Sequence, residues 1–399
     1  MQNRYKSDIV IVGQQAWNVS IGSNCKDIAL ELSRHNRVLY VDSPLDRITS
    51  LRARKEIDIT RQKEVIRKKS DGLREIKDGL WTLSPDVMIE SINWINSGSI
   101  FDYLNKRNNR LFANSIKKAL KRLDFTNFIL FNDNDIFKSF YLKEFLEPRI
   151  SVYYSRDFML GVDYWRKHGE RLEPMLIGKS DVCVANSAYL SNYCKQYNPN
   201  SFDIGQGCNL EGFHKSNLKA AQEIAGMNGP KVGYVGALQS IRLDVQLISY
   251  LATSRPDWNI ILVGPQDDVF KNSNLHSLPN IYFLGSKTQD SLPNYINSFD
   301  VCINPQLINS VTIGNYPRKI DEYLALGKPV VAVRTEALSI FENFIYVADN
   351  KEEFVKLVEA ALIDNQKEFS NQRIQLARSH SWENSVLKLY DAIESVNKS

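Results

Sequence analysis

Strand-like and helix-like segments alternate through this chain twice, and the repetition leaves few folds open. A continuous apolar run at residues 8–13 begins the first round, and a second run at 231–236, after Gly229-Pro230, begins another. Both runs end in glycine, and such uninterrupted apolar segments are typical of strands buried on both faces of a parallel sheet. We therefore expect an α/β chain of two Rossmann-like, doubly wound domains that face a cleft, with a ligand near the carboxyl ends of the strands.

The apolar patterns and the Gly and Pro positions predict the individual elements. In the first half we expect a helix at 27–35 and strands at 8–13, 37–42, 80–83, 128–131, 150–154 and 182–186. In the second half we expect strands at 231–236, 259–264, 281–284, 301–304 and 329–333, and helices at 243–254, 292–298, 317–326 and 352–363. A last helix at 382–396 is expected to cross back to the N-terminal domain. These predictions define an N-terminal domain, which comprises residues 1–205 and the returning segment 376–399, and a C-terminal domain at 206–375.

Composition and cysteine content exclude several classes of protein. The 399 residues are 43% hydrophobic and 24% charged, which is average for soluble globular chains. No apolar run approaches the roughly 18 residues of a membrane span, and the chain enters its first strand without a signal-peptide pattern, so we expect a cytoplasmic protein. The five cysteines are scattered without a C-x-x-C pair, so we expect buried thiols and no protein metal site.

Positive charge is concentrated in the N-terminal third. Residues 1–122 hold 23 Lys and Arg against 14 Asp and Glu, whereas the remainder holds 27 against 32. The excess gathers at 47–69 and at 106–122, and the second stretch places apolar residues near a helical period beside a cationic face. An ordinary solvated helix explains this pattern, as does docking on an anionic membrane, where each basic residue adds about 1 kcal/mol. We expect no nucleic-acid partner, because no recognition motif accompanies the pI of 8.6.

A helix predicted at 317–326 carries the most specific local signal. Pro317 and Gly327 mark its two ends, and its first turn holds Arg318 and Lys319. A helix N-terminus already bears partial positive charge, so each cation there costs roughly 0.3–1 kcal/mol unless an anion binds. This conflict predicts an anion-binding site at the start of the helix.

Two further features adjoin that helix. The preceding loop at 309–315 is small and polar, so its backbone N–H groups are candidates to bind a diphosphate. Glu322 lies one turn after Arg318 and Lys319 on the same helix face. Either Glu322 forms a surface ion pair worth about 0.2–0.5 kcal/mol, or its carboxylate accepts hydrogen bonds from ribose hydroxyls, each worth roughly 1.5–3 kcal/mol.

The segment 316–332 resembles the donor-binding signature of GT-B fold glycosyltransferases of the family-4, or group 1, type, particularly the bacterial surface-polysaccharide subgroup. The stretches 153–157, 180–187, 205–213 and 281–305 resemble the same family in order and spacing. The resemblance implies transfer of a sugar from a UDP-, GDP- or dTDP-sugar to a saccharide or lipid-linked acceptor, with retention of configuration and without a metal or other cofactor. A lipid-linked acceptor would place the chain at the inner face of the cell membrane.

The resemblance also implies roles for individual residues. Glu322 matches the second Glu of the family's E-x7-E motif and is expected to bind the ribose, while Gly314 stands where the first Glu would be. Ala237 replaces a phosphate-binding Arg, so Arg318 and Lys319 are expected to take over part of its role. The expected donor contacts are Gly236, Arg242, Gly285, Ser310, Val311, Thr312, Arg318, Lys319 and Glu322, and Gly13 is an expected binding residue because its loop resembles the family's glycine loop beside the acceptor. The expected catalytic residues are Asp157 and Lys319.

Alternatives remain for several residues and for the activity. Asp157, at a strand end, either caps a turn or serves as the base of an inverting reaction. Asp133-Asn-Asp135 is similar to a D-x-D metal motif of another transferase fold, which the second α/β half disfavours, and His168 and His214 are more often structural than catalytic. A dehydrogenase is disfavoured because G-x-G-x-x-G is absent. The alternatives to a transferase are a sugar-nucleotide epimerase or hydrolase and a non-catalytic subunit that binds sugar nucleotides.

Overall fold

The computed structural model describes residues 7–18, 23–52, 57–213, 218–363 and 367–397 and divides the chain into two compact units. Unit 1 comprises Met1–Gly205 and Ser385–Ser399, and unit 2 comprises Gln206–Asn384. From the sequence, the segment that returns to the first domain was expected to begin at 376. In the structure Ala377 belongs to a core of unit 2, and the change of unit falls within the last helix, α15 (Trp382–Asn397).

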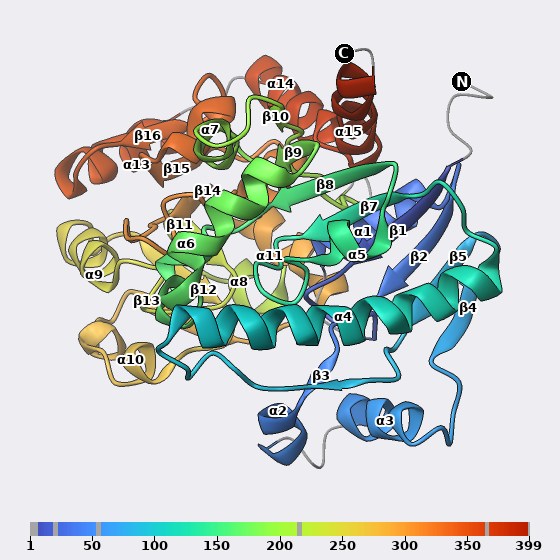
Figure 1. Ribbon diagram of the computed structural model, residues 1–399. Coiled ribbons are helices and arrows are strands. Elements are labelled where there is room, and N and C mark those ends of the chain that lie inside the picture. The colour runs from blue at the N-terminus through green and yellow to red at the C-terminus, as the bar shows by residue number, and fades with distance from the viewer. Residues whose placement is uncertain (1–6, 19–22, 53–56, 214–217, 364–366, 398–399) are drawn as a thin grey trace. The chain divides into compact units, whose positions relative to one another are not determined.

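Unit 1 contains one large sheet, drawn in blue to green in Figure 1. Its strands are β1 (Asp8–Val12), β2 (Arg37–Val41), β4 (Leu73–Lys77), β5 (Leu80–Leu83), β7 (Ile129–Asp133), β8 (Ile150–Ser155), β9 (Val182–Ala185) and β10 (Ser201–Asp203). Their order is β10-β9-β8-β7-β1-β2-β5-β4, and every pair is parallel except β4 with β5. A separate pair joins β3 (Leu45–Asp46) to β6 (Met88–Ile89). The strands expected in this half are confirmed, with ends within two residues.

Four short or polar strands of unit 1 escape a reading of the sequence, one of them the three-residue β10 at the sheet edge. β4 has the sequence Leu-Arg-Glu-Ile-Lys and lies half exposed at the sheet edge, where charged residues are favoured and the apolar signal of a buried strand is missing. β3 and β6 contain two residues each, which is too short for a periodic pattern.

The helices of unit 1 are α1 (Asn24–Leu32), α2 (Arg47–Arg52), α3 (Ile57–Ile66), α4 (Gly98–Leu123), α5 (Leu142–Leu146), α6 (Asp163–Lys179) and α7 (Ala188–Lys195). The helix expected at 27–35 is α1, which ends earlier because the Asn36 side-chain amide donates to the carbonyl of Leu32 at 2.9 Å. A core on one face of the sheet joins α4 and α5 to β1, β2 and β7.

Helix α4 confirms the amphipathic pattern of the basic stretch. Phe101, Phe112 and Ile116 are fully buried on one side. Seven lysines and arginines of the helix are exposed, and five of them we call the α4 cation stripe: Lys106, Arg107, Arg110, Lys117 and Lys121. Within the described ranges, no helix combines the length and the apolar character that crossing a lipid bilayer requires.

Unit 2 contains six parallel strands, β11 (Lys231–Val235), β12 (Asn259–Val263), β13 (Ile281–Gly285), β14 (Val301–Asn304), β15 (Val330–Val333) and β16 (Tyr346–Ala348). Their order, β13-β12-β11-β14-β15-β16, is that of a doubly wound dinucleotide-binding sheet. The helices are α8 (Gln222–Ala225), α9 (Val245–Ser254), α10 (Asp268–Lys271), α11 (Leu292–Ser298), α12 (Arg318–Ala325), α13 (Lys351–Ile363) and α14 (Lys367–Ser379). The second α/β half predicted from the sequence is confirmed.

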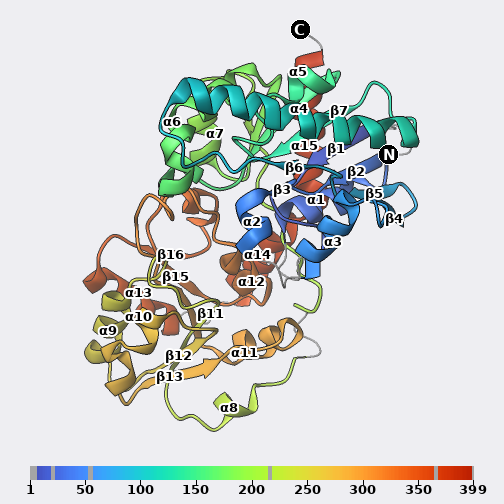
Figure 2. The same ribbon diagram turned by 60° about the horizontal axis from the view of Figure 1, so that its bottom comes forward.

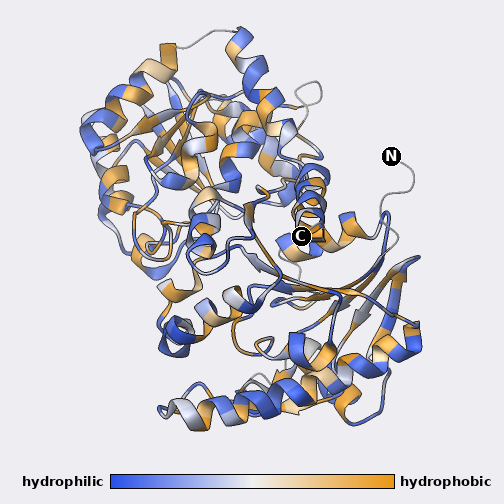
Figure 3. Cartoon of the chain, turned by 45° about the horizontal axis from the view of Figure 1, so that its top comes forward, coloured by the Kyte–Doolittle hydropathy of each residue, from blue (hydrophilic) through white to orange (hydrophobic). Residues whose placement is uncertain are grey.

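Two cores cover the two faces of the unit 2 sheet. One core joins α9, α10 and α13 to the sheet, and the other joins α11, α12 and α14 to it, as Figure 2 shows. In both units the strands are mostly hydrophobic and many helices are striped, with a hydrophilic side, as the colours of Figure 3 show. Because both sheets are built from parallel strands, we expect a ligand in each unit to bind at the carboxyl ends of these strands.

Candidate functional site

Two glycines bring the central strands of unit 2 into close contact at their carboxyl ends. Gly236 follows β11 with φ +143°, and Gly264 follows β12 with φ +151°. The N–H of Gly236 donates to the carbonyl of Val263 at 2.8 Å, and a Cβ added to Gly264 would lie 2.0 Å from the carbonyl oxygen of Gly236. Only glycine fits this combination of positive φ and close approach.

Helix α12 starts beside this glycine pair. Its C-terminal end is a Schellman cap, in which Gly327, at φ +64°, donates to Leu324 at 2.7 Å and Lys328 donates to Tyr323 at 3.1 Å. This confirms the predicted glycine cap. Pro317 precedes the first helical residue rather than occupying it, with φ −85° and ψ 73°.

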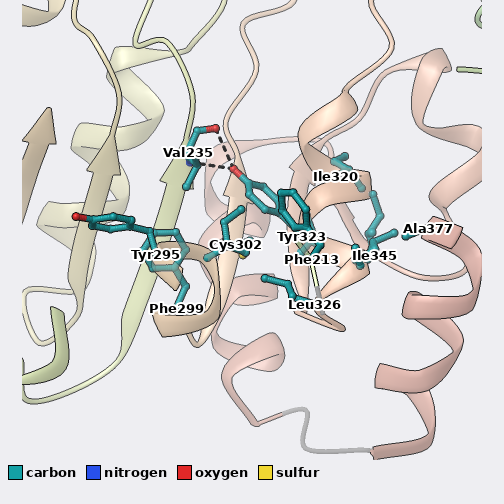
Figure 4. Packing of buried hydrophobic residues seen from close by; sticks show 14 of the residues in the cluster. Phe213, Val235, Tyr295, Phe299, Cys302, Ile320, Tyr323, Leu326, Ile345 and Ala377 are labelled. Atoms are coloured by element: carbon teal, nitrogen blue, oxygen red, sulfur yellow. Dashed lines mark hydrogen bonds between the residues drawn. The ribbon is translucent and has the colours of Figure 1, made fainter. Parts of the chain in front are cut away.

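Tyr323 fixes α12 to the end of β11. Its ring is fully buried in the core of unit 2, and its hydroxyl accepts a hydrogen bond from the N–H of Val235 at 3.0 Å and donates to the carbonyl of Val235 at 3.4 Å (Figure 4). Because Val235 directly precedes Gly236, this contact sets the position of the helix against the glycine. Because Val235 and Tyr323 lie far apart in the chain, no local sequence pattern reveals this contact.

The side chain of Lys319 lies directly on Gly236. A Cβ at position 236 would lie 2.0 Å from Lys319 Cε and 2.8 Å from its Nζ, and that ammonium lies 5.2 Å from the ring centroid of Tyr234. Arg318, the neighbouring cation, interacts with the buried thiol of Cys208. The first turn of α12 therefore places Lys319 at the carboxyl end of β11, and the neighbouring Arg318 beside Cys208. We call Gly236, Arg318, Lys319 and Glu322 the α12 site.

Glu322 is a half-buried carboxylate of the α12 site. Burial raises its pKa, and the nearby charges of Arg318 and Lys319 lower it. It forms no ion pair within 4 Å with any residue that the structure describes, so a helix-surface ion pair does not account for it. A half-buried carboxylate beside two cations is suited to accept hydrogen bonds from ligand hydroxyls.

A buried polar cluster, which the sequence did not reveal, fixes the start of α12. Asp321 is fully buried, with Oδ1 2.7 Å from Nδ1 of His380 and Oδ2 accepting from the Tyr316 hydroxyl at 2.8 Å. Burial raises the pKa of Asp321, and His380 and Tyr316 lower it. His380 follows α14, far along the chain, so no local pattern could have paired it with Asp321.

The loop before α12 is closed by its own hydrogen bonds. The side-chain oxygen of Asn309 accepts from the N–H groups of Val311 and Thr312 at 2.9 and 3.1 Å, and the buried Thr312 hydroxyl donates to the carbonyl of Leu307. The expectation that these N–H groups are available for a diphosphate is therefore wrong for Val311 and Thr312. The sequence offered a signal, since Asn commonly accepts hydrogen bonds from the backbone two residues ahead.

The remaining expected donor contacts of unit 2 lie in loops, and they differ in exposure and in hydrogen bonding. Arg242 is exposed, and its carbonyl accepts from the N–H of Leu307 at 2.8 Å, which ties the two loops together. Gly285 has φ +68°, and a Cβ there would have no neighbour within 4 Å, so its positive φ, and not crowding, favours glycine. Ser310 and Gly314 belong to the closed loop.

Gly13 and Asp157, the expected site residues of unit 1, lie at the carboxyl ends of its strands. A Cβ on Gly13 would lie 2.1 Å from the Tyr40 hydroxyl oxygen, so the loop after β1 packs tightly on β2. Part of this loop, residues 19–22, lies outside the described residues. Asp157 follows β8, is 42% exposed and accepts from Arg156 Nη1 at 3.0 Å.

A buried ion pair anchors this edge of unit 1. Arg156 Nε donates to Asp133 Oδ1 at 2.7 Å, and Asp133 is fully buried. Burial lowers the pKa of Arg156, but the Asp133 and Asp157 carboxylates raise it above its usual range. The side-chain oxygen of Asn134 accepts from the N–H groups of both Arg156 and Asp157, at 3.0 and 3.1 Å.

The D-x-D-like pair and the histidines have structural partners. Asp135 is buried and accepts from the N–H groups of Phe137 and Lys138 at 3.1 and 2.9 Å. Across the described residues, no three His, Cys, Asp or Glu side chains gather closely enough to hold a metal ion. His168 stacks on Phe101, and its Nε2 lies 2.9 Å from the carbonyl oxygen of Ile95. His214 lies outside the described residues.

Glu173 links a buried aromatic cluster to the Asp157 loop. It is fully buried in α6, and Oε1 accepts from the Tyr153 hydroxyl at 2.7 Å. That hydroxyl also accepts from Asn134 Nδ2 at 2.8 Å. Burial raises the pKa of Glu173 from 4.5 to about 7, against hydrogen bonds from Tyr153 and Tyr193 that lower it.

This burial predicts a pH-dependent stability. Between pH 4.5 and 7 the folded state holds the Glu173 proton while the unfolded state loses it, so the contribution of Glu173 is complete below pH 4.5 and is lost as pH rises through 7. The loss is on the order of 3 kcal/mol. We expect Glu173→Gln to flatten this part of the profile in urea unfolding measured from pH 5 to 8. Glu170→Gln, exposed on the same helix, is the control; equal slopes for wild type and Glu173→Gln would contradict the prediction.

Comparison with known sequences gives a partial match. Residues 229–364 match the family described as glycosyl transferases group 1. TuaH of Bacillus subtilis (strain 168), which is named for glycosyl transfer in teichuronic acid biosynthesis, is 29% identical over 234 residues. That alignment covers 55% of this chain and 58% of TuaH, so the chain spans less than two thirds of this relative's length.

Solved structures resemble nearly the whole chain. The sucrose-phosphate synthase of Thermosynechococcus elongatus has a TM-score of 0.65 at 12% identity, over 98% of this chain and 100% of its own. HepE of Anabaena, solved in complex with UDP and glucose, has a TM-score of 0.64 at 15% identity over the same shares. At these identities the likeness establishes the fold, and it confirms the fold expected from the sequence.

Proposed function

We propose that this chain, a GT-B fold member of the group 1 glycosyltransferases, transfers a sugar from a nucleotide-diphosphate sugar to a saccharide or lipid-linked acceptor. The observation that carries the proposal is the α12 site. Two cations lie at a helix N-terminus beside Gly236, and Glu322 has no ionic partner among the described residues. A sugar nucleotide supplies both missing partners, a diphosphate for the cations and ribose hydroxyls for the carboxylate.

The chemistry follows from the charge that develops during transfer. Breaking the bond between the anomeric carbon and the phosphate oxygen leaves negative charge on the nucleoside diphosphate. Fixed cations and a helix N-terminus stabilise that charge without reorganisation. We assign this role to Lys319, supported by Arg318, and ribose binding to Glu322. Since these groups supply the positive charge, we propose a reaction that needs no metal ion.

The other expected residues receive narrower roles in the proposal. The closed loop from Ser310 to Thr312 shapes the place beside Gly314 where the family's first Glu would contact the donor sugar. Arg242 and Gly285 border the donor from neighbouring loops. We propose retention of configuration from the family resemblance alone.

In unit 1, Gly13 and Asp157 are the proposed acceptor-side residues. We assign to the Asp157 carboxylate, whose side chain is 42% exposed, the role of receiving the proton of an acceptor hydroxyl, with Arg156 Nη1 donating to it at 3.0 Å. An inverting product would make Asp157 the base, so the anomeric configuration of the product decides between the two courses.

A lipid-linked acceptor would bring the chain to the cytoplasmic face of the cell membrane. The α4 cation stripe supports this part of the proposal, because each basic residue near an anionic bilayer adds about 1 kcal/mol to binding. Sedimentation with anionic and with neutral vesicles measures this contact directly; equal binding to both would contradict it.

Calorimetric titration of the full chain with UDP, GDP and dTDP, without added metal, tests the proposed function. We expect selective binding of one diphosphate, and UDP is the first to test because HepE was solved with it. Glu322→Ala is expected to weaken binding about tenfold or more. Binding to none of them, or binding indifferent to Glu322, would contradict the proposal.

Turnover separates the alternatives to a transferase. Consumption of the sugar nucleotide without any acceptor would indicate an epimerase or a hydrolase. Tight binding with no turnover of any donor would indicate a non-catalytic subunit. This alternative arises because Gly314 stands where the family has its first Glu.

A further inference from the structure

A cavity of about 530 Å³ lies wholly within unit 1. Its walls come from the end of α3, the turn into β4, the end of β5 and the C-terminal half of α4. Because β5 is parallel to β2, the cavity opens at the carboxyl edge of the sheet, where α/β sheets bind ligands. We call it the α3–α4 cavity. Its volume lies in the range of small-molecule sites.

The α3–α4 cavity has an apolar wall and a cationic rim. The wall includes Val65, Leu83 and Ala119. The rim carries four cations and two carboxylates: Lys68, Lys69, Lys118, Arg122, Asp71 and Asp86. This composition leaves a surplus of two positive charges around one small cavity.

Only half of the rim cations are neutralised by the rim carboxylates. Lys118 pairs with Asp86 at 2.6 Å, and Arg122 forms a two-pronged pair with Asp71 at 2.9 and 2.7 Å. The pair with Arg122 contributes to a pKa of about 2 for Asp71, so its carboxylate is charged at neutral pH. Lys68 and Lys69 form no ion pair with any residue that the structure describes.

The surrounding backbone holds the rim in a defined shape. Gly72 is buried, and a Cβ there would lie 2.2 Å from the carbonyl oxygen of Ser84 and 2.8 Å from Val65 Cγ1. Lys68, at φ +58°, forms the C-terminal cap of α3: its N–H donates to the carbonyl of Val65 at 2.9 Å, and the N–H of Lys69 donates to the carbonyl of Glu64 at 2.8 Å. Two exposed lysines without an ion pair to any described residue therefore line this cavity, where a bound anion would compensate their charge.

We propose that the α3–α4 cavity binds the anionic group of a small molecule, a phosphate ester or a carboxylate, and that the molecule is an anionic saccharide. The anion binding follows from the rim alone. The saccharide assignment rests on the proposed function, in which unit 1 meets the acceptor. We expect the anion to contact Lys68 and Lys69, because both Nη atoms of Arg122 are already engaged in the two-pronged pair with Asp71.

Calorimetric titration of the full chain with glucuronate, glucose 6-phosphate, glucose and inorganic phosphate tests the proposal. We expect the two anionic sugars to bind, with weaker binding of inorganic phosphate and none of glucose. Lys69→Glu is expected to weaken binding of the anionic sugars about tenfold. Lys117→Glu makes the same charge change on exposed α4 outside the cavity and should have less than about a twofold effect.

Three controls keep the outcomes separate. Lys319→Glu, in unit 2, should leave the binding of anionic sugars unchanged. A Lys319→Glu protein that loses UDP binding but still binds anionic sugars would separate the α3–α4 cavity from the donor site. Lys69→Gln replaces the charge-reversed variant if the latter fails to fold. Binding of inorganic phosphate as tight as that of the sugars would overturn the saccharide assignment, and equal losses for Lys69→Glu and Lys117→Glu would overturn the cavity as the site.

Discussion

A Lys319→Glu protein is expected to bind its nucleoside diphosphate at least about 100-fold more weakly than the wild type. The substitution removes a charge-assisted contact worth roughly 1.5–3 kcal/mol and places a carboxylate beside Gly236, where the diphosphate would bind. Each 1.4 kcal/mol corresponds to about a tenfold change in affinity. Calorimetric titration gives the dissociation constant. The dissociation constant of Lys319→Gln, which removes the charge without reversing it, should lie between those of the wild type and Lys319→Glu.

A matched control for this charge reversal is Lys356→Glu. Lys356 is an exposed lysine of α13, which packs on the opposite face of the unit 2 sheet from α12. It should leave the affinity unchanged. Wild-type affinity in the Lys319→Glu protein would place the donor elsewhere and contradict the assignment of the α12 site.

A ligand change tests Glu322 separately from Lys319. If the Glu322 carboxylate binds ribose hydroxyls, the wild type should prefer UDP over its 2′-deoxy form, and Glu322→Gln should reduce this preference. Lys319→Gln should weaken both ligands equally, because it acts on the diphosphate. An unchanged preference in Glu322→Gln would remove the ribose from the proposed contacts of Glu322.

The second large effect is expected at the buried ion pair of unit 1. Asp133→Ala leaves the Arg156 guanidinium without its main partner in a site where Arg156 is only 13% exposed. Breaking a buried pair in this way costs about 3–5 kcal/mol. Urea unfolding followed by circular dichroism should show a large fall in the stability of unit 1.

The double variant and a surface control make this prediction specific. Asp133→Ala combined with Arg156→Met removes both charges, so it should recover part of the lost stability. Asp102→Ala breaks the exposed pair with Arg171 in the same unit and should cost less than about 1 kcal/mol. A loss no larger for Asp133→Ala than for Asp102→Ala would contradict the structural role of the buried pair.

Most of the fold could be predicted because strands buried on both faces of a parallel sheet are recognisable in the sequence as continuous apolar runs. The apolar runs at β1 and β11, each followed by glycine, located both sheets. Proline and glycine defined α12 because their backbone preferences are local. Strand β4 escaped prediction because it lies at an exposed edge, where polar residues are favoured and the pattern weakens, and β3 and β6 are too short to show a pattern.

The candidate site could be predicted only in part, for the same reason. Arg318, Lys319 and Glu322 are neighbours on one helix, so their spacing alone places them on one side. The loop before α12 was misjudged because Asn309 accepts the N–H groups of Val311 and Thr312, a local competition that composition does not reveal.

The sequence by itself therefore determined the two α/β halves, the ends of α12 and the charges at its start, all of which depend on contacts a few residues apart. Tertiary structure alone decided which distant groups meet. It placed Lys319 on Gly236, joined Asp321 to His380 and Asp133 to Arg156, and gathered the lining of the α3–α4 cavity from α3, β4, β5, α4 and the loops between them. These contacts depend on strand order and packing, which no periodicity along the chain encodes.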